Sequence, residues 1–151
     1  MISKKDMMIL SSLRKDARMN LTKMARKTGI PVSTIFDKIK GYKGNLVTKH
    51  TTLINFDLIG YNTRAKVILK VKKEDKTAMK GYLFKNQNVN SFYRVNNGYD
   101  FMFEAVFRNL KETEEFIEAI EEKFGIIEKQ VFYITEDVKR ESFMEEDILF
   151  I

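Results

Sequence analysis

Residues 3–40 place hydrophobic side chains at the 3.6-residue period of α-helices, in three short segments. The first segment begins at Ser3, whose hydroxyl can cap a helix, and Asp6 follows three residues later to complete the capping pattern. Ile9, Leu10 and Leu13 form one hydrophobic face. The pattern predicts an amphipathic helix that packs against the segments after it.

A second helix is predicted between Asn20 and Gly29. Asparagine is a good N-terminal cap, and glycine suits the left-handed conformation that ends a helix. Leu21, Met24 and Ala25 face inward at helical spacing. Its outward residues are basic: Lys23, Arg26 and Lys27.

A third helix is predicted to start near Val32, because Pro31 suits the first turn. Ile35 and Ile39 occupy its buried side. The polar residues that can face outward are Ser33, Thr34, Asp37, Lys38 and Lys40. Three short helices separated in this way are typical of a helix-turn-helix unit.

From residue 45 onward the helical period gives way to extended patterns. A connecting strand is predicted at 51–56 and a loop at 57–61. The segments that follow are a strand at 65–72, a helix at 74–85, strands at 89–95 and 101–107, a helix at 110–124 and a strand at 126–135. This order predicts a ferredoxin-like βαββαβ domain, an antiparallel sheet with both helices on one face. The fold class is therefore α+β.

The second face of that sheet needs a cover. Ile68, Phe92, Tyr93, Phe132 and Tyr133 provide more apolar surface than one layer of helices can bury, which predicts a homodimer formed sheet to sheet. The C-terminal tail, residues 138–151, ends in four hydrophobic residues at 148–151, and we expect it to pack against the protein.

Charge divides the chain. Residues 1–62 carry twelve Lys and Arg against four Asp and Glu, a net +8, whereas residues 63–151 have a net charge of −2. Duplex DNA binding is driven largely by counterion release from phosphates, so a compact basic module predicts a double-stranded DNA partner. The alternative is a merely solvated lysine-rich surface.

Other chemistry is restricted by composition. No cysteine is present, which excludes disulfides, a thiol nucleophile and cysteine metal ligands. We expect no catalytic residues, metal or cofactor. The chain has no long apolar run of the kind that crosses a membrane, and we expect a cytoplasmic protein.

The third helix carries the expected DNA contacts. Its N-terminal residues, Ser33 and Thr34, are expected to read base edges, and Lys38 and Lys40 to bind phosphates. Asp37 would repel phosphates unless it accepts a hydrogen bond from cytosine. The basic residues of the second helix complete the predicted interface.

Several motifs resemble the Lrp/AsnC family of feast/famine transcription factors, over residues 2 to 135. The motifs in the first part are Asp6-Met7-Met8-Ile9-Leu10, Lys15-Asp16-Ala17-Arg18, the run from Leu21 to Gly29, Ser33-Thr34-Ile35 with Ile39, and Leu58-Ile59-Gly60-Tyr61. In the second part the turn Asn97-Gly98-Tyr99-Asp100 resembles the family's glycine-to-aspartate turn.

The resemblance implies a winged or plain helix-turn-helix domain joined by a hinge to an effector-sensing ferredoxin-like domain. The corresponding divisions are a DNA-binding domain at 1–47, a hinge and linker at 48–62, an effector and oligomerisation domain at 63–137, and the tail. Family members form dimers and higher oligomers, and small ligands, commonly amino acids, bind near the turn that here is Gly98, Tyr99 and Asp100. Asp100 could accept a ligand ammonium; an ordinary connecting turn is an equal alternative.

The chain departs from the family at two places. At the centre of the third helix, Phe36-Asp37 stands where the family usually has a basic residue. The DNA sequence that the family binds therefore cannot be assigned to this chain. Gly41-Tyr42-Lys43-Gly44 replaces a leucine-glutamate run, so we expect the third helix to end early and the hinge to bend differently.

The function expected from the sequence is a sequence-specific DNA-binding regulator, with an amino-acid effector. An architectural DNA-coating protein without an effector is an alternative that the sequence leaves open. A sirohaem-decarboxylase-like enzyme shares the architecture but needs histidines at the tetrapyrrole site. The one histidine here, His50, falls in the hinge.

Overall fold

The computed structural model describes residues 1–146 and divides the chain into two compact units. The helical unit comprises Met1–Leu53 and the C-terminal segment that starts at Val138, and the sheet unit comprises Ile54–Asp137. The predicted hydrophobic end of the tail, residues 148–151, lies outside the described residues.

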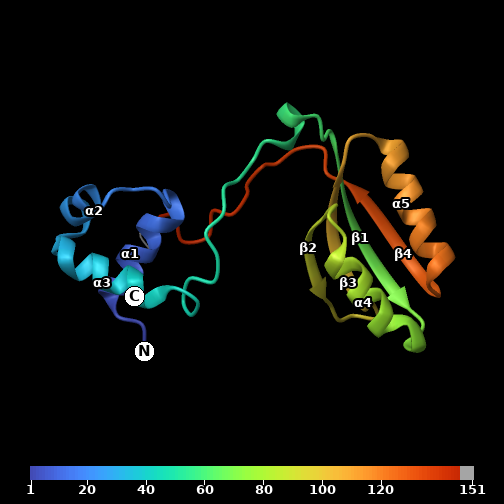
Figure 1. Cartoon of the computed structure of the whole chain (residues 1–151), viewed down its shortest axis with the longest axis horizontal. Coiled ribbons are helices and arrows are strands. Elements are labelled where there is room, and N and C mark those ends of the chain that lie inside the picture. The colour runs from blue at the N-terminus through green and yellow to red at the C-terminus, as the bar shows by residue number, and fades with distance from the viewer. Residues whose placement is uncertain (147–151) are drawn as a thin grey trace. The chain divides into compact units, whose positions relative to one another are not determined.

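Three helices form the helical unit, as the sequence predicted: α1 (Lys4–Lys15), α2 (Leu21–Thr28) and α3 (Val32–Tyr42) (Figure 1). The predicted caps are present. The Ser3 hydroxyl accepts from the Asp6 amide while the Asp6 carboxylate accepts from the Ser3 amide. The helices pack around a cluster of buried residues: Ile9, Met24, Ile30, Ile35 and Tyr42.

The third helix ends within the run from Gly41 to Gly44 that was expected to end it early. It continues through Gly41 and stops at Tyr42. Tyr42 is buried in the helical core, and its hydroxyl donates to Asp6 at 2.6 Å. These tertiary contacts outweigh the roughly 1 kcal/mol by which glycine disfavours a helix.

The segment that connects the units contains no strand, so the strand predicted at 51–56 is wrong for the single chain. A 3-10 turn at Phe56–Ile59, capped by Asn55, occupies the start of the predicted loop. A strand needs a neighbour for its hydrogen bonds, and residues 51–56 pair with none of the four strands of the sheet.

The sheet unit has the predicted βαββαβ order. Its elements are β1 (Thr63–Val71), a 3-10 turn (Lys73–Asp75), α4 (Lys76–Lys85), β2 (Val89–Arg94), β3 (Phe101–Phe107), α5 (Leu110–Lys123) and β4 (Ile126–Tyr133). The strands are antiparallel in the order β2-β3-β1-β4. This is the ferredoxin-like arrangement expected from the sequence.

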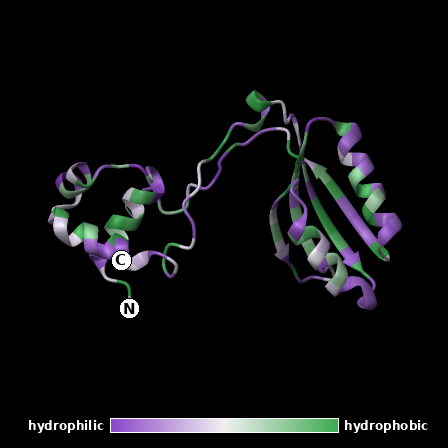
Figure 2. Cartoon of the chain, in the orientation of Figure 1, coloured by the Kyte–Doolittle hydropathy of each residue, from purple (hydrophilic) through white to green (hydrophobic). Residues whose placement is uncertain are grey.

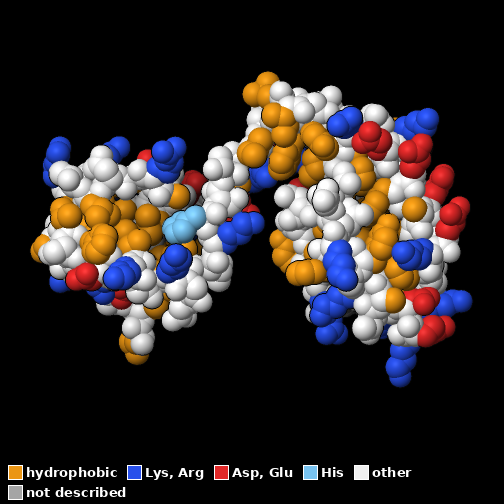
Figure 3. All heavy atoms as spheres, viewed as in Figure 1, with side chains coloured by type: hydrophobic (Ala, Val, Ile, Leu, Met, Phe, Trp, Pro, Cys, Tyr) orange, Lys and Arg blue, Asp and Glu red, His pale blue; other side chains and the backbone are white. Residues whose placement is uncertain are grey.

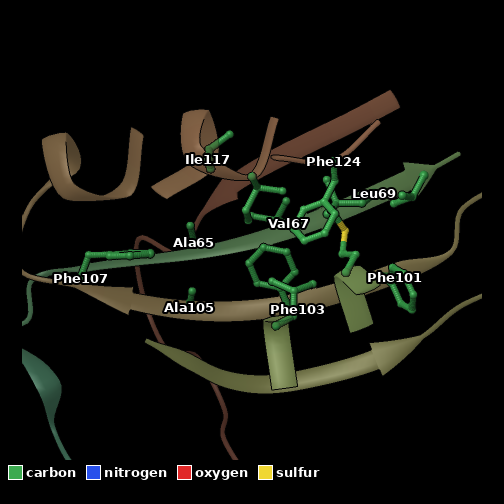
Figure 4. Packing of buried hydrophobic residues seen from close by; sticks show 13 residues of the cluster. Ala65, Val67, Leu69, Phe101, Phe103, Ala105, Phe107, Ile117 and Phe124 are labelled. Atoms are coloured by element: carbon green, nitrogen blue, oxygen red, sulfur yellow. The ribbon is translucent and has the colours of Figure 1, made fainter. Parts of the chain in front are cut away.

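Buried and half-buried residues alternate along β1, which separates the two faces of this sheet; Figure 2 colours the strands by hydropathy. Ala65, Val67 and Leu69 of β1 and Phe103 of β3 point to the side covered by α4 and α5, where the core lies (Figure 4). Phe103 is fully buried, and its ring meets the Phe116 ring of α5 edge to face at 6.0 Å.

The opposite face carries fewer aromatic residues than expected. Tyr93, Met102 and Ile68 lie side by side across β2, β3 and β1 on this face, and Phe132 of β4 lies opposite Lys66.

Two of the five predicted residues belong to the helix-covered side instead. Phe92 pairs with Phe103 and Tyr133 pairs with Ala65, so both share the side of the core. Successive residues of a strand point to opposite faces, so 92 and 93, or 132 and 133, cannot share one.

The C-terminal segment packs on α1 of the helical unit. Arg14 donates from Nε to the Phe143 carbonyl at 2.9 Å and from Nη2 to the Glu141 carbonyl at 2.6 Å. The Ser11 hydroxyl donates to the Glu146 carbonyl at 3.4 Å. We call these contacts the Arg14 clasp. The last described residues of the chain are therefore part of the helical unit.

Candidate nucleic-acid interface

The exposed face of α3 consists of two neighbouring rows of residues. Val32, Phe36 and Lys40 are exposed and follow one another at four-residue intervals, and Ser33 and Asp37 form the second row. Residues four apart lie on the same side of a helix, so these five side chains share one surface. Of the predicted contact residues, Ser33, Asp37 and Lys40 therefore lie together.

Thr34 and Lys38 form the border of that surface. Both side chains are half-buried, and they lie one turn apart on the flank of the helix. Sequence periodicity grouped them with the outward residues because both are polar. Ile35 and Ile39, next to them in the sequence, pack in or against the helical core as predicted.

Lys38 is held by Asp6 of α1. Its ammonium lies 2.7 Å from Asp6 Oδ1, and the Tyr42 hydroxyl donates to the same oxygen at 2.6 Å. The second carboxylate oxygen accepts from the Ser3 amide at 2.9 Å and contacts the Ser3 hydroxyl. One carboxylate thus joins the first turn of α1 to the last two turns of α3.

The electrostatics of this cluster follow from its contacts. The hydrogen bond from Lys38, followed by those from Ser3 and Tyr42, holds the pKa of Asp6 well below its usual range. Burial, together with the bond to Asp6, raises the pKa of Tyr42 above its usual value. The Lys38 ammonium is compensated by the Asp6 carboxylate, and this ion pair links α3 to α1. The role of Lys38 as a phosphate ligand stays a prediction.

The second helix also presents basic side chains to solvent. Lys23, Arg26 and Lys27 are all exposed. The Lys23 amide donates to the Asn20 side chain at 2.7 Å, which caps the helix and leaves the ammonium free to extend outward. Figure 3 shows Lys and Arg side chains around the edge of the helical unit, with hydrophobic side chains between them.

The predicted effector turn lies between β2 and β3. Gly98 has φ of +83°, and Asn97 before it has φ of +63°, so the chain reverses through two left-handed residues. Gly98 meets that requirement without a steric cost. The amide of Asp100 donates to the Leu69 carbonyl at 2.8 Å, which ties the turn to β1.

Both oxygens of the Asp100 carboxylate have partners within the sheet unit. Oδ1 lies 2.7 Å from the Lys76 ammonium at the start of α4, and Oδ2 accepts from the Val71 amide at 2.8 Å. Burial raises the pKa of Asp100, but the bonds from Lys76 and Val71 outweigh it, and the net pKa is lowered. These contacts support the structural alternative that the sequence left open; a bond to a ligand ammonium stays a prediction.

Tyr99 has different partners from Asp100. Its hydroxyl donates to Glu128 at 3.1 Å and accepts from the Gln130 amide nitrogen at 2.9 Å. Gln130 pairs with Ile68, so this contact lies on the sheet face that the helices leave uncovered. Burial and the bond to Glu128 raise the pKa of Tyr99. The three residues of the predicted effector turn therefore act in two different places.

Sequence comparison describes the helical unit directly. A family profile for winged helix-turn-helix DNA-binding domains matches residues 2–40, which span α1, α2 and most of α3. An uncharacterised HTH-type transcriptional regulator of Pyrococcus horikoshii is 26% identical over 141 residues, 93% of this chain and 95% of its own length.

Solved structures match both units together. A transcriptional regulator of Neisseria meningitidis, determined in complex with L-Met, has a TM-score of 0.84 at 15% identity and covers 93% of this chain and 94% of its own. Escherichia coli AsnC has a TM-score of 0.82 at 17% identity and covers 95% of this chain and 99% of its own. The chain has the two-domain fold of the Lrp/AsnC family.

The DNA-binding profile matches residues of the helical unit only. Two features of the helical unit were not predicted from the sequence. They are the exposed hydrophobic side chains of Val32 and Phe36 on α3, and the bonds from Lys38 and Tyr42 to Asp6. The exposed side chain of Phe36 had a signal in the sequence, since Phe36 is off the helical period of Ile35 and Ile39.

None of the helices within residues 1–146 is long and apolar enough to cross a membrane.

Proposed function

We propose that this protein is a sequence-specific transcriptional regulator that binds double-stranded DNA through α3. The observation that carries the proposal is the exposed face of α3 beside the basic residues of α2, inside the segment that matches a DNA-binding profile. The relatives found by sequence are named HTH-type transcriptional regulators, and no catalysis is part of the proposal.

The exposed residues divide by chemistry into two roles. Ser33, an exposed residue in the first turn of α3, and Thr34 beside it are proposed to meet base edges, and Asp37 to accept from the amino group of cytosine. Lys40 and the α2 cations Lys23, Arg26 and Lys27 are proposed to bind phosphates, which fix the position of the helix without reading sequence.

Dimerisation through the uncovered sheet face is a further part of the proposal. Ile68, Tyr93, Met102 and Phe132 leave an apolar surface there that a second copy can bury. Two recognition helices in a dimer would read half-sites about one helical turn, ~34 Å, apart. Analytical ultracentrifugation at micromolar concentration should show a dimer or larger species, and a monomer would contradict this part.

An amino-acid effector at the turn from Gly98 to Asp100 is the least direct part. The Neisseria meningitidis protein is described in complex with L-Met, and it shares this fold. A ligand ammonium would have to compete with Lys76 for Asp100. Titration with single amino acids, followed by calorimetry on the wild type and on Asp100→Asn, tests it: binding that is unchanged in the variant would contradict the assignment.

The decisive experiment for the function is genomic footprinting of the tagged protein with and without a pool of amino acids. A regulator should protect discrete sites and change its occupancy with the effector. An architectural protein would protect DNA broadly. The ratio of specific to nonspecific affinity, at fixed salt, should be on the order of 10³ or more for a regulator.

A further inference from the structure

Two hydrophobic side chains on the recognition helix are turned away from the protein core. Phe36 is 56% exposed and Val32 is 42% exposed, one helical turn apart on the same row. The other large hydrophobic residues of the helix, Ile35 and Ile39, pack in or against the helical core. The sequence thus places an aromatic ring where periodicity calls for a polar residue.

The helical unit makes little use of this ring. Fully burying a phenylalanine side chain stabilises a protein by about 1.5–3 kcal/mol, and most of that gain is forgone here. Within residues 1–146, every close pair of aromatic rings lies in the sheet unit, in the sequence range 82–124, and none of these pairs includes Phe36. The exposed ring is therefore available to a partner of the helical unit.

The surroundings of Phe36 identify the partner. Lys40 follows it on the same row, and Ser33 and Asp37 lie on the next row, so the ring is flanked by polar and charged groups. The basic residues of α2 add positive charge. An apolar protein groove would have to desolvate these charges, whereas the major groove of DNA offers phosphates for the cations and hydrogen-bonding groups for the rest.

DNA has one apolar group in the major groove that a phenylalanine can recognise. Thymine alone carries a methyl group on its major-groove edge, and apolar side chains contact it. Val32 and Phe36 lie in the first two turns of α3, the part of a recognition helix that meets base edges. Asp37, adjacent to the ring, can accept only from an amino group, as cytosine and adenine present.

We propose that Phe36, supported by Val32, contacts the C5 methyl group of a thymine and makes that base a determinant of the operator. This inference rests on the proposed function, since it needs α3 in the major groove. Phe36 stands where the Lrp/AsnC family usually has a basic residue, and the proposed contact would give this chain a different DNA sequence preference.

Deoxyuridine substitution tests the proposal, because deoxyuridine keeps every hydrogen bond of thymidine and lacks only the methyl group. A high-affinity duplex is first selected from a randomised library with the wild-type chain. Each thymine is then replaced singly, and affinity is measured at fixed salt. At least one replacement per half-site should weaken binding by about fourfold, the value of one methyl group removed from water.

The protein variants separate this contact from general effects. Phe36→Ala should bind the same duplexes with no discrimination between thymidine and deoxyuridine at that position. Phe36 is absent from the cluster of residues that form the helical core or pack against it, so the helical unit should stay folded in Phe36→Ala. The matched control is Phe84→Ala, which deletes a phenylalanine that is 82% exposed on α4 and should keep the full discrimination.

The outcomes are distinct. A wild-type chain that binds DNA with equal affinity at every thymine-to-deoxyuridine replacement overturns the inference and leaves the proposed function intact. Discrimination that persists in Phe36→Ala overturns it as well, since another group then reads the methyl. A wild-type chain that binds no duplex contradicts the proposed function itself.

Discussion

Among residues 1–146, the core cluster of the sheet unit contains thirteen buried residues, whereas that of the helical unit contains five. Small domains bury a smaller share of their surface, so each remaining contact matters more for stability. The helical unit supplements its core with polar contacts: Asp6 joins α1 to α3, and Arg14 joins α1 to the C-terminal segment. The sheet unit has side-chain bonds of its own, such as those from Lys76 and Val71 to Asp100, but it adds them to a larger apolar core.

The comparison bears on function because the polar contacts in the helical unit hold the element that is proposed to meet DNA. Apolar packing tolerates small shifts of one helix along another, whereas a charged hydrogen bond fixes donor and acceptor within a few tenths of an ångström. Asp6 therefore determines where α3 lies in its own unit. Substitution of Phe103 in the sheet unit and of Asp6 in the helical unit should show how far the stability of each unit depends on these contacts.

The largest effect is expected in the sheet core. Phe103→Ala removes a fully buried ring between β1, β3 and α5 and should lower the free energy of unfolding of the sheet unit by about 3–5 kcal/mol. Hydrogen exchange of the β1 and β3 amides measures it. The helical unit should exchange as in the wild type, and equal destabilisation of both units would refute their independence.

A smaller effect is expected from the Asp6 cluster. Asp6→Asn keeps the shape of the side chain but loses the charge that Lys38, Ser3 and Tyr42 share. We expect the free energy of unfolding of the helical unit to fall by about 1–2 kcal/mol at neutral pH. The matched control is Asp37→Asn, an exposed acid on α3, which should change it by less than about 0.5 kcal/mol.

The pH dependence has a definite sign. The folded state lowers the pKa of Asp6 below its ordinary value of 3.8, so ionised Asp6 stabilises the fold above that pH. The stabilisation is lost as the pH falls through and below that value. Thermal melts of the wild type and of Asp6→Asn should therefore differ most at neutral pH, and the difference should shrink progressively as the pH falls below 3.8 toward the lowered pKa of folded Asp6. A constant difference across that range would show that the charge of Asp6 is irrelevant.

The Arg14 clasp should contribute less than the Asp6 cluster. Arg14→Ala removes two hydrogen bonds to the carbonyls of Glu141 and Phe143, both on exposed residues, and should cost about 1 kcal/mol. Faster hydrogen exchange in residues 138–146 is the expected readout. Lys15→Ala is the control, since it removes the same charge from the end of α1. Unchanged exchange in Arg14→Ala would mean that the clasp does not hold the segment.

Local patterns predicted the elements well. The three helices and the βαββαβ order follow from periods of 3.6 and 2 residues, which each segment expresses by itself. The caps at Ser3 and Asn20 were also readable, because they depend on residues three positions apart.

Features that need a distant partner were not predictable. The period showed that Lys38 is polar but could not show that Asp6 lies beside it. The strand expected at 51–56 had the right composition and no neighbour to pair with. Phe92 and Tyr133 were assigned to the open face because composition was considered without strand register. Nothing in the sequence links Arg14 to residues more than a hundred positions later.

The central claim is that the helical unit, through α3, binds duplex phosphates while the sheet unit does not. Salt titration of DNA affinity tests it most directly, with one lysine removed from each unit: Lys40→Ala on α3 and Lys80→Ala on α4, both exposed. Each phosphate contact contributes about 0.9 to the slope of log affinity against log salt. Lys40→Ala should reduce the slope by about that amount for each protomer bound, and Lys80→Ala should leave it unchanged. Equal slopes for all three proteins, or no retention of duplex DNA at low ionic strength, would contradict the claim.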